Sequence, residues 1–297
     1  MIQDLGESVE NSGKSHSSSF LLAADHLAVG FLSLSGLLLL TFAVSETVYL
    51  KFGLGNLAGA WLIWQGAKRT PGTWLAGLFR IVYPLAVISV THLEVELFIH
   101  MIYGADFTFD ALISGWDNFL FGMNPHLHFH TVLTQWYWVE LMHLFYLNYY
   151  FLLIGSITWV YLKRNDDFAH FVFVYLGIFL TFVVIYSFFP VVGPVSERGG
   201  IFPETGWLTN LVDFLFFIGA PDGAAFPSSH VGQSVGIYLL LQPIHRYAKT
   251  GIRLVILGIG ISMIYVFIHY AIDAIAGFFA GWLLYHLWNR FYHYLKT

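Results

Sequence analysis

The stretch FAHFVFVYLGIFLTFVVIYSFFP, residues 168–190, decides the fold class of this chain. It contains no Asp, Glu, Lys or Arg, and about 20 mostly apolar residues are enough for a helix to cross a bilayer. Six further windows are mostly apolar, although several contain a few charged residues. They run over Leu27–Leu50, Thr73–Tyr103, Thr131–Leu162, Ser228–His245, Ile252–Ile268 and Tyr270–Phe291. The sequence therefore predicts an all-α, polytopic integral membrane bundle with about seven spans.

The overall composition agrees with this prediction. Hydrophobic residues make up 57% of the 297 residues and charged residues 10%, against about 25% charged in soluble domains. Residues 1–24 are rich in serine and are predicted to form a disordered tail. Residues 25–70 are predicted to hold one extra N-terminal transmembrane span and a loop, and residues 71–297 a single membrane-embedded domain. The absence of cysteine excludes disulfides, thiolate metal sites and a cysteine nucleophile.

Positive charge is distributed unequally between the two sides of the seven-span arrangement. Lys14 and Arg198 fall on one side, and all other basic residues fall on the opposite side: Lys51, Lys68, Arg69, Arg80, Lys163, Arg164, Arg246, Lys249, Arg253, Arg290 and Lys296. Cytoplasmic loops carry the excess of Lys and Arg, so we expect the C-terminus inside and the N-terminus outside. On the outer side, the apolar residues of 105–130 and 207–218 have the spacing of interfacial amphipathic helices. These two helices could cover a cavity.

Two histidine motifs occur where apolar segments begin or end, both on the predicted outer side. The first is Phe226-Pro227-Ser228-Ser229-His230 and the second is His269-Tyr270-Ala271-Ile272-Asp273. Asp273 lies one helical turn after His269 and can accept its ring N–H, which fixes the tautomer and raises the basicity of the other nitrogen. Pro227 suits the first turn of a helix, whose free N–H groups, with the hydroxyls of Ser228 and Ser229, form an anion site. This pattern favours a phosphoryl transfer carried out by two histidines.

The pattern Pro-Ser-x-His, followed by His-x-x-x-Asp about 40 residues later, resembles the type 2 phosphatidic acid phosphatase superfamily. The resemblance implies a six-helix catalytic core in residues 71–297, preceded by one span. It also implies that His269 is the nucleophile that forms a phosphohistidine, that Asp273 orients it, and that His230 is the general acid. Ser228 and Ser229 would be phosphate ligands. Residues 117–125 and 190–194 and the sequence His-Tyr-x-Ile-Asp are similar to the inositol phosphorylceramide synthase branch and its bacterial relatives, which implies a bacterial inner membrane.

Two cationic positions of the family pattern are missing. The last motif usually begins Ser-Arg, but Ser262 is followed here by Met263, and no Lys precedes an Arg-Pro pair at the spacing of the first motif. Each charge-assisted bond lost costs roughly 1.5 to 3 kcal/mol, and a phosphodiester monoanion needs fewer such bonds than a phosphomonoester dianion. The sequence therefore favours transfer of a phospho-head group from a phosphodiester lipid. Arg198 is the candidate replacement for the missing cations.

A second polar cluster is predicted on the second and third spans. Its members are His92, Glu96, His100, Glu140 and His143, which could form a head-group pocket, bind a metal or pair the helices. His126, His128 and His130 alternate along a loop and could chelate zinc, but three exposed histidines more often simply contact water at the interface.

The sequence as a whole indicates a lipid phosphotransferase of the outer leaflet that needs no metal or other cofactor. Its partners would be a phospholipid substrate, an acceptor that is an alcohol, a lipid or water, and the bilayer, with no role for nucleic acid. Three alternatives stay open: a lipid phosphate or pyrophosphate phosphatase with the same site, an intramembrane metal enzyme built on the second cluster, and a lipid transporter.

Overall fold

The computed structural model describes residues 4–44, 46–68, 73–104, 107–198, 201–202, 206–219 and 221–297, with side chains from residue 23 onward except that of Ile218. Within these residues the regular elements are helices, and one isolated β-bridge pairs Val191 with Ala224. Six helical segments there are long and apolar enough to cross a membrane: Ala23–Thr41, Trp74–Tyr103, Trp136–Lys163, Asn165–Phe188, Arg246–Tyr265 and Ala271–Tyr294. The prediction of an all-α polytopic membrane fold is confirmed.

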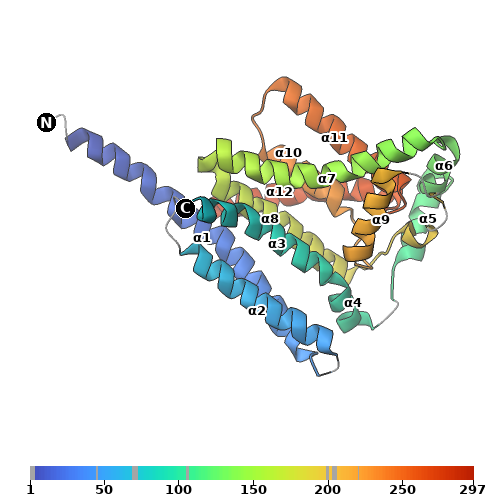
Figure 1. Cartoon of the computed structure of the whole chain (residues 1–297), viewed down its shortest axis with the longest axis horizontal. Coiled ribbons are helices and arrows are strands. Elements are labelled where there is room, and N and C mark those ends of the chain that lie inside the picture. The colour runs from blue at the N-terminus through green and yellow to red at the C-terminus, as the bar shows by residue number, and fades with distance from the viewer. Residues whose placement is uncertain are drawn as a thin grey trace. The chain divides into compact units, whose positions relative to one another are not determined.

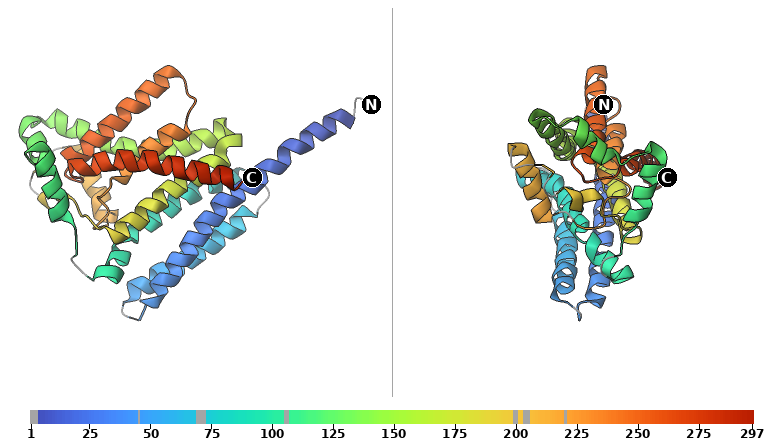
Figure 2. Two further views of the ribbon diagram at one scale, coloured as in Figure 1. Left: turned by 180° about the vertical axis from the view of Figure 1, so that it is seen from behind. Right: turned by 90° about the vertical axis from the view of Figure 1, so that its right-hand side faces the viewer.

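The chain forms two compact units. Unit 1 holds the residues up to Ile88, Ile157–Gly177 and Trp288–Thr297, and unit 2 holds Ser89–Ser156 and Ile178–Leu287. The boundaries fall inside four long helices, which are α3 (Trp74–Leu93), α7 (Trp136–Lys163), α8 (Asn165–Phe188) and α12 (Ala271–Tyr294) (Figures 1 and 2).

Unit 1 begins with a helical hairpin of α1 (Asp4–Thr41) and α2 (Thr47–Ala67), which lie side by side in Figures 1 and 2. A Cβ atom at Gly36 would come within 2.9 Å of the Gly53 carbonyl oxygen, so the two backbones approach closely because both positions are glycine. In the same contact, Asn56 donates a hydrogen bond of 2.8 Å to the Ser35 hydroxyl. Small and polar residues therefore hold the two helices together, as is usual where hydrocarbon surrounds them.

This hairpin differs from what the sequence predicts for residues 1–70. The helix α1 already begins at Asp4, inside the segment expected to be a disordered tail. The expected single span over residues 27–50 is interrupted after Thr41, and the expected loop after it is the helix α2. The glycines that permit the close contact also lower the hydropathy of α2, and that is why a search for continuous apolar windows misses it.

The hairpin returns the chain to the level at which the apolar part of α1 starts. Asp25, near the start of the apolar part of α1, forms a bidentate contact with Arg80 of α3, with both carboxylate oxygens 2.8 Å from Nη1. Arg80 also donates to the carbonyl oxygen of Ala67, the last residue of α2. The start of apolar α1, the end of α2 and the start of α3 therefore lie at the same end of unit 1.

Unit 2 contains the shorter helices. They are α4 (Val95–Tyr103), α5 (Asp110–Phe121), α6 (Pro125–Val132), the 3-10 turn η1 (Pro194–Glu197), α9 (Trp207–Gly219), α10 (Ser229–Leu240) and, with full span length, α11 (Arg246–Tyr265). The predicted interfacial segments correspond to α5 with α6 and to α9, although residues 105–106 lie outside the described part. The predicted span 228–245 is shorter than expected, because the 12 residues of α10 rise only about 18 Å.

Candidate active site

The first histidine motif forms the N-terminus of α10. Ser228 is the N-cap residue, and its Oγ accepts a hydrogen bond of 3.4 Å from the amide of Val231. The buried Tyr186 of α8 fixes this turn on both sides: its hydroxyl donates to the Pro227 carbonyl oxygen and accepts from the Ser229 amide, each at 2.9 Å. Two amides that the sequence assigned to an anion site, those of Ser229 and Val231, are therefore bonded within the protein.

The second motif forms the turn between α11 and α12. Phe267 adopts a positive φ of 60°, which ends the run of α11 and turns the chain toward His269. Asp273, in the first turn of α12, accepts a 2.8 Å hydrogen bond from the Tyr270 amide through Oδ2. The same oxygen lies 3.4 Å from Nδ1 of His269, which is long for a hydrogen bond but directs the ring, as is common in unliganded sites.

The two motifs, about 40 residues apart in the sequence, are in direct contact. The Ser228 amide donates to the Asp273 carbonyl oxygen at 2.9 Å, and the Ser228 hydroxyl lies 3.1 Å from Nε2 of His269. The rings of His230 and His269 are 5.7 Å apart between centroids and nearly perpendicular. With its Nδ1 toward Asp273, His269 presents Nε2 to Ser228, on the side where His230 lies.

Glycines on α12 allow this contact. A Cβ atom at Gly277 would come within 2.4 Å of the Ser228 carbonyl oxygen, and one at Gly281 within 2.1 Å of the Gly232 carbonyl oxygen. The spacing of four residues places both glycines on one face of α12, so α10 packs against it backbone to backbone. The close packing at these two glycines thus allows the histidine motifs to come together.

Burial sets the protonation state of His269, whose side chain is only 1% exposed. Burial lowers the pKa of His269 to about 3, a hydrogen bond with the Ala225 backbone acts in the opposite direction, and His92 lowers the pKa a little further. The ring is therefore neutral at physiological pH, which is the form that has a free electron pair for attack on phosphorus.

Two aspartates of α5 hold the segments that carry the site. Asp117 is fully buried and accepts hydrogen bonds of 2.8 Å from the amides of Ala271 and Ile272, at the start of α12. Asp110 accepts bonds of 2.9 and 2.8 Å from the amides of Val192 and Gly193. Burial raises the pKa of Asp117, and its two amide bonds lower it in part. Neither residue was among the predicted site residues; their spacing of seven, two turns of one helix, was the available signal.

The family comparison agrees with this geometry. A family model described as the PAP2 superfamily matches residues 111–287, more than half of the chain. The chain belongs to the PAP2 superfamily. No curated protein and no solved structure matches it. The resemblance inferred from the two histidine motifs is confirmed at the level of the superfamily, and the chain carries a PAP2 enzyme domain, for which lipid phosphates are the implied substrates.

The loop that precedes the PAP2 histidine turn is built to pass close to it. Val191 forms the bridge with residues 223–225: its amide donates to the Gly223 carbonyl oxygen and its own carbonyl oxygen accepts from the Ala225 amide. Gly193 has a φ of 82°, and a Cβ there would come within 2.3 Å of the Ile268 carbonyl oxygen. Only glycine fits this position, directly beside the residue that precedes His269.

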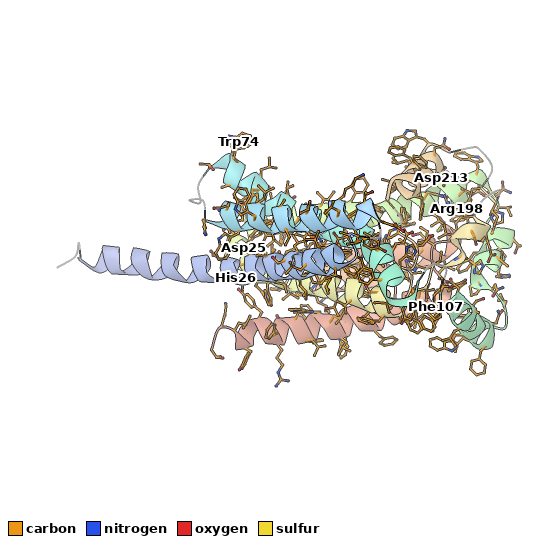
Figure 3. All side chains as sticks on the ribbon, turned by 90° about the horizontal axis from the view of Figure 1, so that it is seen from below. Asp25, His26, Trp74, Phe107, Arg198 and Asp213 are labelled. Carbon is orange, nitrogen blue, oxygen red and sulfur yellow. The ribbon has the colours of Figure 1, made fainter. Side chains whose placement is uncertain are left out.

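Arg198, expected to bind phosphate, uses all three guanidinium nitrogens within the protein. Nε and Nη2 donate to Oδ1 of Asp213 at 3.0 and 2.6 Å, a pair that Figure 3 labels. Nη1 donates to the Val266 carbonyl oxygen at 2.7 Å, and Nη2 also contacts Nε2 of His143 at 2.9 Å. In this unliganded PAP2 site, Arg198 therefore ties α9 and the end of α11 together.

The second polar cluster is not assembled as one site. The Glu140 carboxylate accepts hydrogen bonds from the amides of Leu208 and Thr209 and from the Thr209 hydroxyl, so it caps the N-terminus of α9. His143 bonds to the Val139 carbonyl oxygen and to Arg198.

The remaining members lie on other surfaces. Glu96 and His100 form a largely exposed pair 4.0 Å apart on α4. His92 on α3 packs edge-on against the ring of Phe179, and its charge lowers the pKa of His269 slightly. Within the described residues, no three His, Cys, Asp or Glu side chains converge as metal ligands, and the alternating His126, His128 and His130 form no such group either.

Aromatic side chains of α7 surround the partly exposed ring of His230. The ring centroid of Tyr149 lies 4.3 Å from that of His230, and those of Tyr146 and Tyr150 lie at 5.7 and 6.4 Å. The hydroxyls of Tyr146 and Tyr150 are hydrogen bonded to each other at 2.9 Å. The tertiary structure thus places three tyrosines of α7 against the candidate general acid.

Proposed function

We propose that the chain is a membrane lipid phosphotransferase in which His269 forms a phosphohistidine intermediate. The observation that carries the proposal is the alignment of Asp273, His269, Ser228 and His230, with Nδ1 of His269 toward the carboxylate and Nε2 toward the Ser228 hydroxyl. Asp273 stabilises the imidazolium that develops on attack, while His230 stands where it can exchange a proton with the oxygen that leaves phosphorus.

The reaction divides into two displacements. Nε2 of His269 attacks phosphorus, the bond from phosphorus to the alcohol oxygen of the donor lipid breaks, and His230 gives a proton to that oxygen. Burial lowers the pKa of His230 and the negative charge of the substrate phosphate acts in the opposite direction, so His230 takes up this proton when the substrate binds. The acceptor hydroxyl then attacks phosphorus, its proton passes to His230, and the bond between phosphorus and Nε2 breaks. The hydroxyls of Ser228 and Ser229, together with the positive end of α10, would bind the phosphate oxygens.

The charge around the site favours a phosphodiester donor. Arg198 bonds to the Val266 carbonyl oxygen, three residues before His269, and its nitrogens also bond to Asp213 and His143. It would contact a phosphate directly only by releasing Asp213, so we assign to it a positioning role and a favourable field. Neutral donors and a helix terminus suit a monoanion better than a dianion. This supports transfer of a phospho-head group, as in the inositol phosphorylceramide synthase branch, over hydrolysis of a monoester.

The experiment that tests the proposal uses purified protein and phosphate-labelled lipids, both a phosphodiester and a phosphomonoester, with and without an alcohol-bearing lipid. We expect label to move from the phosphodiester to the acceptor, and to be trapped on the protein in an acid-labile, alkali-stable form when the acceptor is omitted. His269→Ala should abolish both signals. His245→Ala, which removes an exposed histidine before α11, is the matched control and should retain both.

The other outcomes identify the alternatives. Release of free phosphate from the monoester would make the protein a phosphatase with the same site. Turnover that survives in His269→Ala would contradict the phosphohistidine mechanism. Movement of unaltered lipid across vesicles in both His230→Ala and His269→Ala would identify a transporter.

We further propose that the site faces the outer leaflet and that both chain ends face the cytoplasm. In this arrangement α2, which is not one of the six apolar segments named above, also crosses the membrane, so the N-terminus lies on the opposite side from the single-span prediction and Lys51 lies toward the outer side. The basic residues at the starts of α3 and α11 and at the ends of α7 and α12 stay together on the inner side. In this cysteine-free chain, Asn118→Cys should react with an impermeant thiol reagent in intact cells, and Lys249→Cys should not. The reverse result would invert the orientation.

A further inference from the structure

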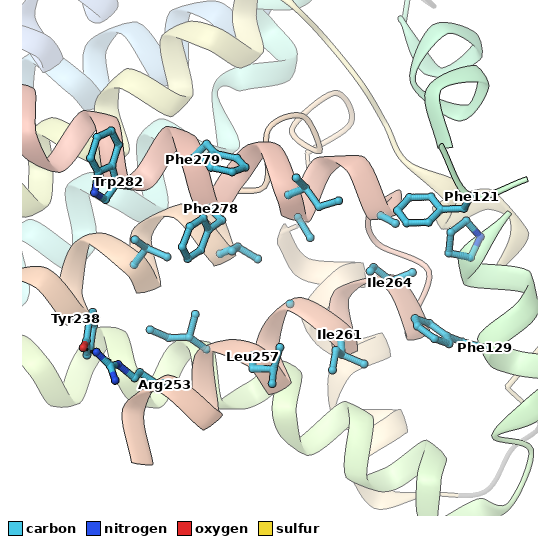
Figure 4. A pocket seen from close by; sticks show the side chains of 18 of the residues that line it. Phe121, Phe129, Tyr238, Arg253, Leu257, Ile261, Ile264, Phe278, Phe279 and Trp282 are labelled. Carbon is cyan, nitrogen blue, oxygen red and sulfur yellow. Dashed lines mark hydrogen bonds between the residues drawn. The ribbon is translucent and has the colours of Figure 1, made fainter. Parts of the chain in front are cut away.

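Unit 2 contains an apolar cavity that the proposed reaction does not use. It has a volume of about 920 Å³ and lies between α11 and α12, with α10 as its floor and α5 and α6 at one end. Figure 4 shows Phe121 and Phe129 at that end and Tyr238 with Arg253 at the other. We call this cavity the α11–α12 groove.

The groove and the candidate active site lie on opposite faces of the α10–α12 contact. Val231 and Ala274 line the groove, and each directly follows a residue of the site, His230 and Asp273. Consecutive helical residues point about 100° apart, and the backbone contacts of Gly277 and Gly281 with α10 close the seam between the two faces. A molecule in the groove therefore cannot also fill the space between His230 and His269.

The lining of the groove suits hydrocarbon. Large apolar side chains there are strongly exposed, including Leu257 at 60%, Phe279 at 63% and Trp282 at 49%. On α11 the lining extends from Arg253 to Ile264, a rise of about 16 Å, or roughly half of the bilayer's hydrocarbon thickness. The groove is thus as long as one leaflet is deep.

A cation stands at the end of the groove farther from the histidine motifs. Arg253 is exposed, and its Nε donates a 2.7 Å hydrogen bond to the hydroxyl of Tyr238, which also lines the groove. The guanidinium lies over the Tyr238 ring, 5.4 Å from its centroid. A planar guanidinium held in this way presents its remaining N–H groups to a phosphate at the membrane surface.

We propose that the α11–α12 groove is a binding site for an anionic phospholipid. One acyl chain occupies the groove, and Arg253 holds the phosphate. The hydrocarbon chain fills the apolar cavity from Arg253 toward the end that lies beside the active site, and the positive charge of Arg253 selects lipids with a net negative head group.

Native mass spectrometry of protein released from nanodiscs tests this proposal, with phosphatidylcholine and phosphatidylglycerol in equal parts as the probe lipids. Wild type should retain phosphatidylglycerol preferentially. Gly260→Leu should fill the groove without strain in its own backbone, because a Cβ there meets only Val231 Cγ2 at 3.9 Å. Arg253→Gln should remove the phosphate contact. Each change should lower retention of phosphatidylglycerol by about tenfold, which corresponds to about 1.4 kcal/mol.

Two variants on the same helix serve as matched controls. Gly251→Leu places the same side chain where the glycine has open space around it, outside the groove. Arg246→Gln removes the same charge from another arginine that contacts a tyrosine, Tyr247. Both should retain lipid as wild type does. Equal retention in all four variants, or equal retention of the two lipids by wild type, would overturn the proposal.

Two further readouts test what occupies the groove and whether the groove is separate from the active site. A dimer that wild type forms and Gly260→Leu loses would show that a second copy of the chain occupies the groove instead, which also overturns the proposal. His269→Ala should keep its phosphatidylglycerol, because the groove does not share the catalytic face. Loss of lipid in that variant would contradict the separation of the two sites, whatever the fate of the phosphotransferase proposal.

Discussion

The two units stabilise buried carboxylates in different ways. In unit 1, Asp25 is 2% exposed and is neutralised by a cation, the Arg80 guanidinium. In unit 2, Asp117 is fully buried and Asp110 partly buried, and both are held by pairs of backbone amides. The Glu140 carboxylate is likewise held by two backbone amides, those of Leu208 and Thr209 at the start of α9. Carboxylates therefore fasten helices in unit 1 and fasten loops and helix starts in unit 2.

The difference has a chemical consequence. An ion pair needs a second charged side chain, whereas an amide pair fixes a backbone segment and adds no cation near the reacting phosphate. Unit 2 thus positions the turn after His269 while leaving the site poor in positive charge, which fits a monoanionic substrate. The ion pair of unit 1 fastens α1 to α3.

The largest effect should come from breaking the ion pair of unit 1. Arg80→Met leaves a buried, uncompensated Asp25 and should lower the free energy of unfolding by about 3 to 5 kcal/mol. Asp25→Asn in the same chain should restore most of the loss, and kcat should stay unchanged below the melting transition. Thermal unfolding in detergent measures this. Arg164→Met, which breaks the more exposed pair with Asp167, should cost less than about 1 kcal/mol. Equal costs for the two pairs would refute the burial argument.

A smaller loss of stability, but a loss of activity, should follow from changing the amide pair of unit 2. Asp117→Asn keeps the shape of the side chain but leaves one backbone amide of α12 facing an NH₂ group. This should lower the free energy of unfolding by about 3 kcal/mol. Because the turn that carries His269 shifts, kcat should fall by roughly a hundredfold with little change in KM. Steady-state kinetics measures both. Asn118→Ala, at the exposed neighbouring position, is the control. A lower stability with unchanged kcat would reduce Asp117 to a structural role.

The smallest effect concerns pH and the buried His269 of unit 2. Unfolded histidine titrates near 6.5, whereas burial lowers the pKa of folded His269 to about 3. Below about pH 6.5 the unfolded state therefore binds a proton that the folded state does not, so stability falls as pH falls through this range toward 3. From pH 7.5 to 5.5, wild type should lose about 1 kcal/mol more than His269→Gln. Parallel pH dependence of the two unfolding free energies would show that His269 is not held neutral.

Some features of the fold could be predicted from local sequence and others could not. The apolar run of residues 168–190 predicts a buried spanning helix, and α8 follows it closely. The hairpin of α1 and α2 escaped prediction because Gly36 and Gly53 contribute little hydropathy, although their lack of side chains allows the contact. A single continuous window over residues 27–50 concealed the turn between Thr41 and Thr47.

The candidate site shows the same division. The spacing of His269 and Asp273 within one helical turn predicts their pairing, and the order of the two motifs predicts the superfamily. The partners of Arg198 could not be predicted, because Asp213, Val266 and His143 come from three separate segments. For the same reason nothing local indicated that Tyr186 bonds to the Ser229 amide, or that Tyr149 packs on His230.

The sequence by itself determined that this chain is an all-helical membrane protein with a PAP2 enzyme domain, since hydropathy over about 20 residues and two short histidine motifs are local properties. Tertiary structure alone decided which polar groups meet. Asp117 and Asp110 become the supports of the site, and Glu140 and His143 do not form a metal centre with the rest of their cluster. A carboxylate has the same sequence signature whether it meets an amide, a guanidinium or a metal, so its role is fixed only when folding brings its partner within about 3 Å.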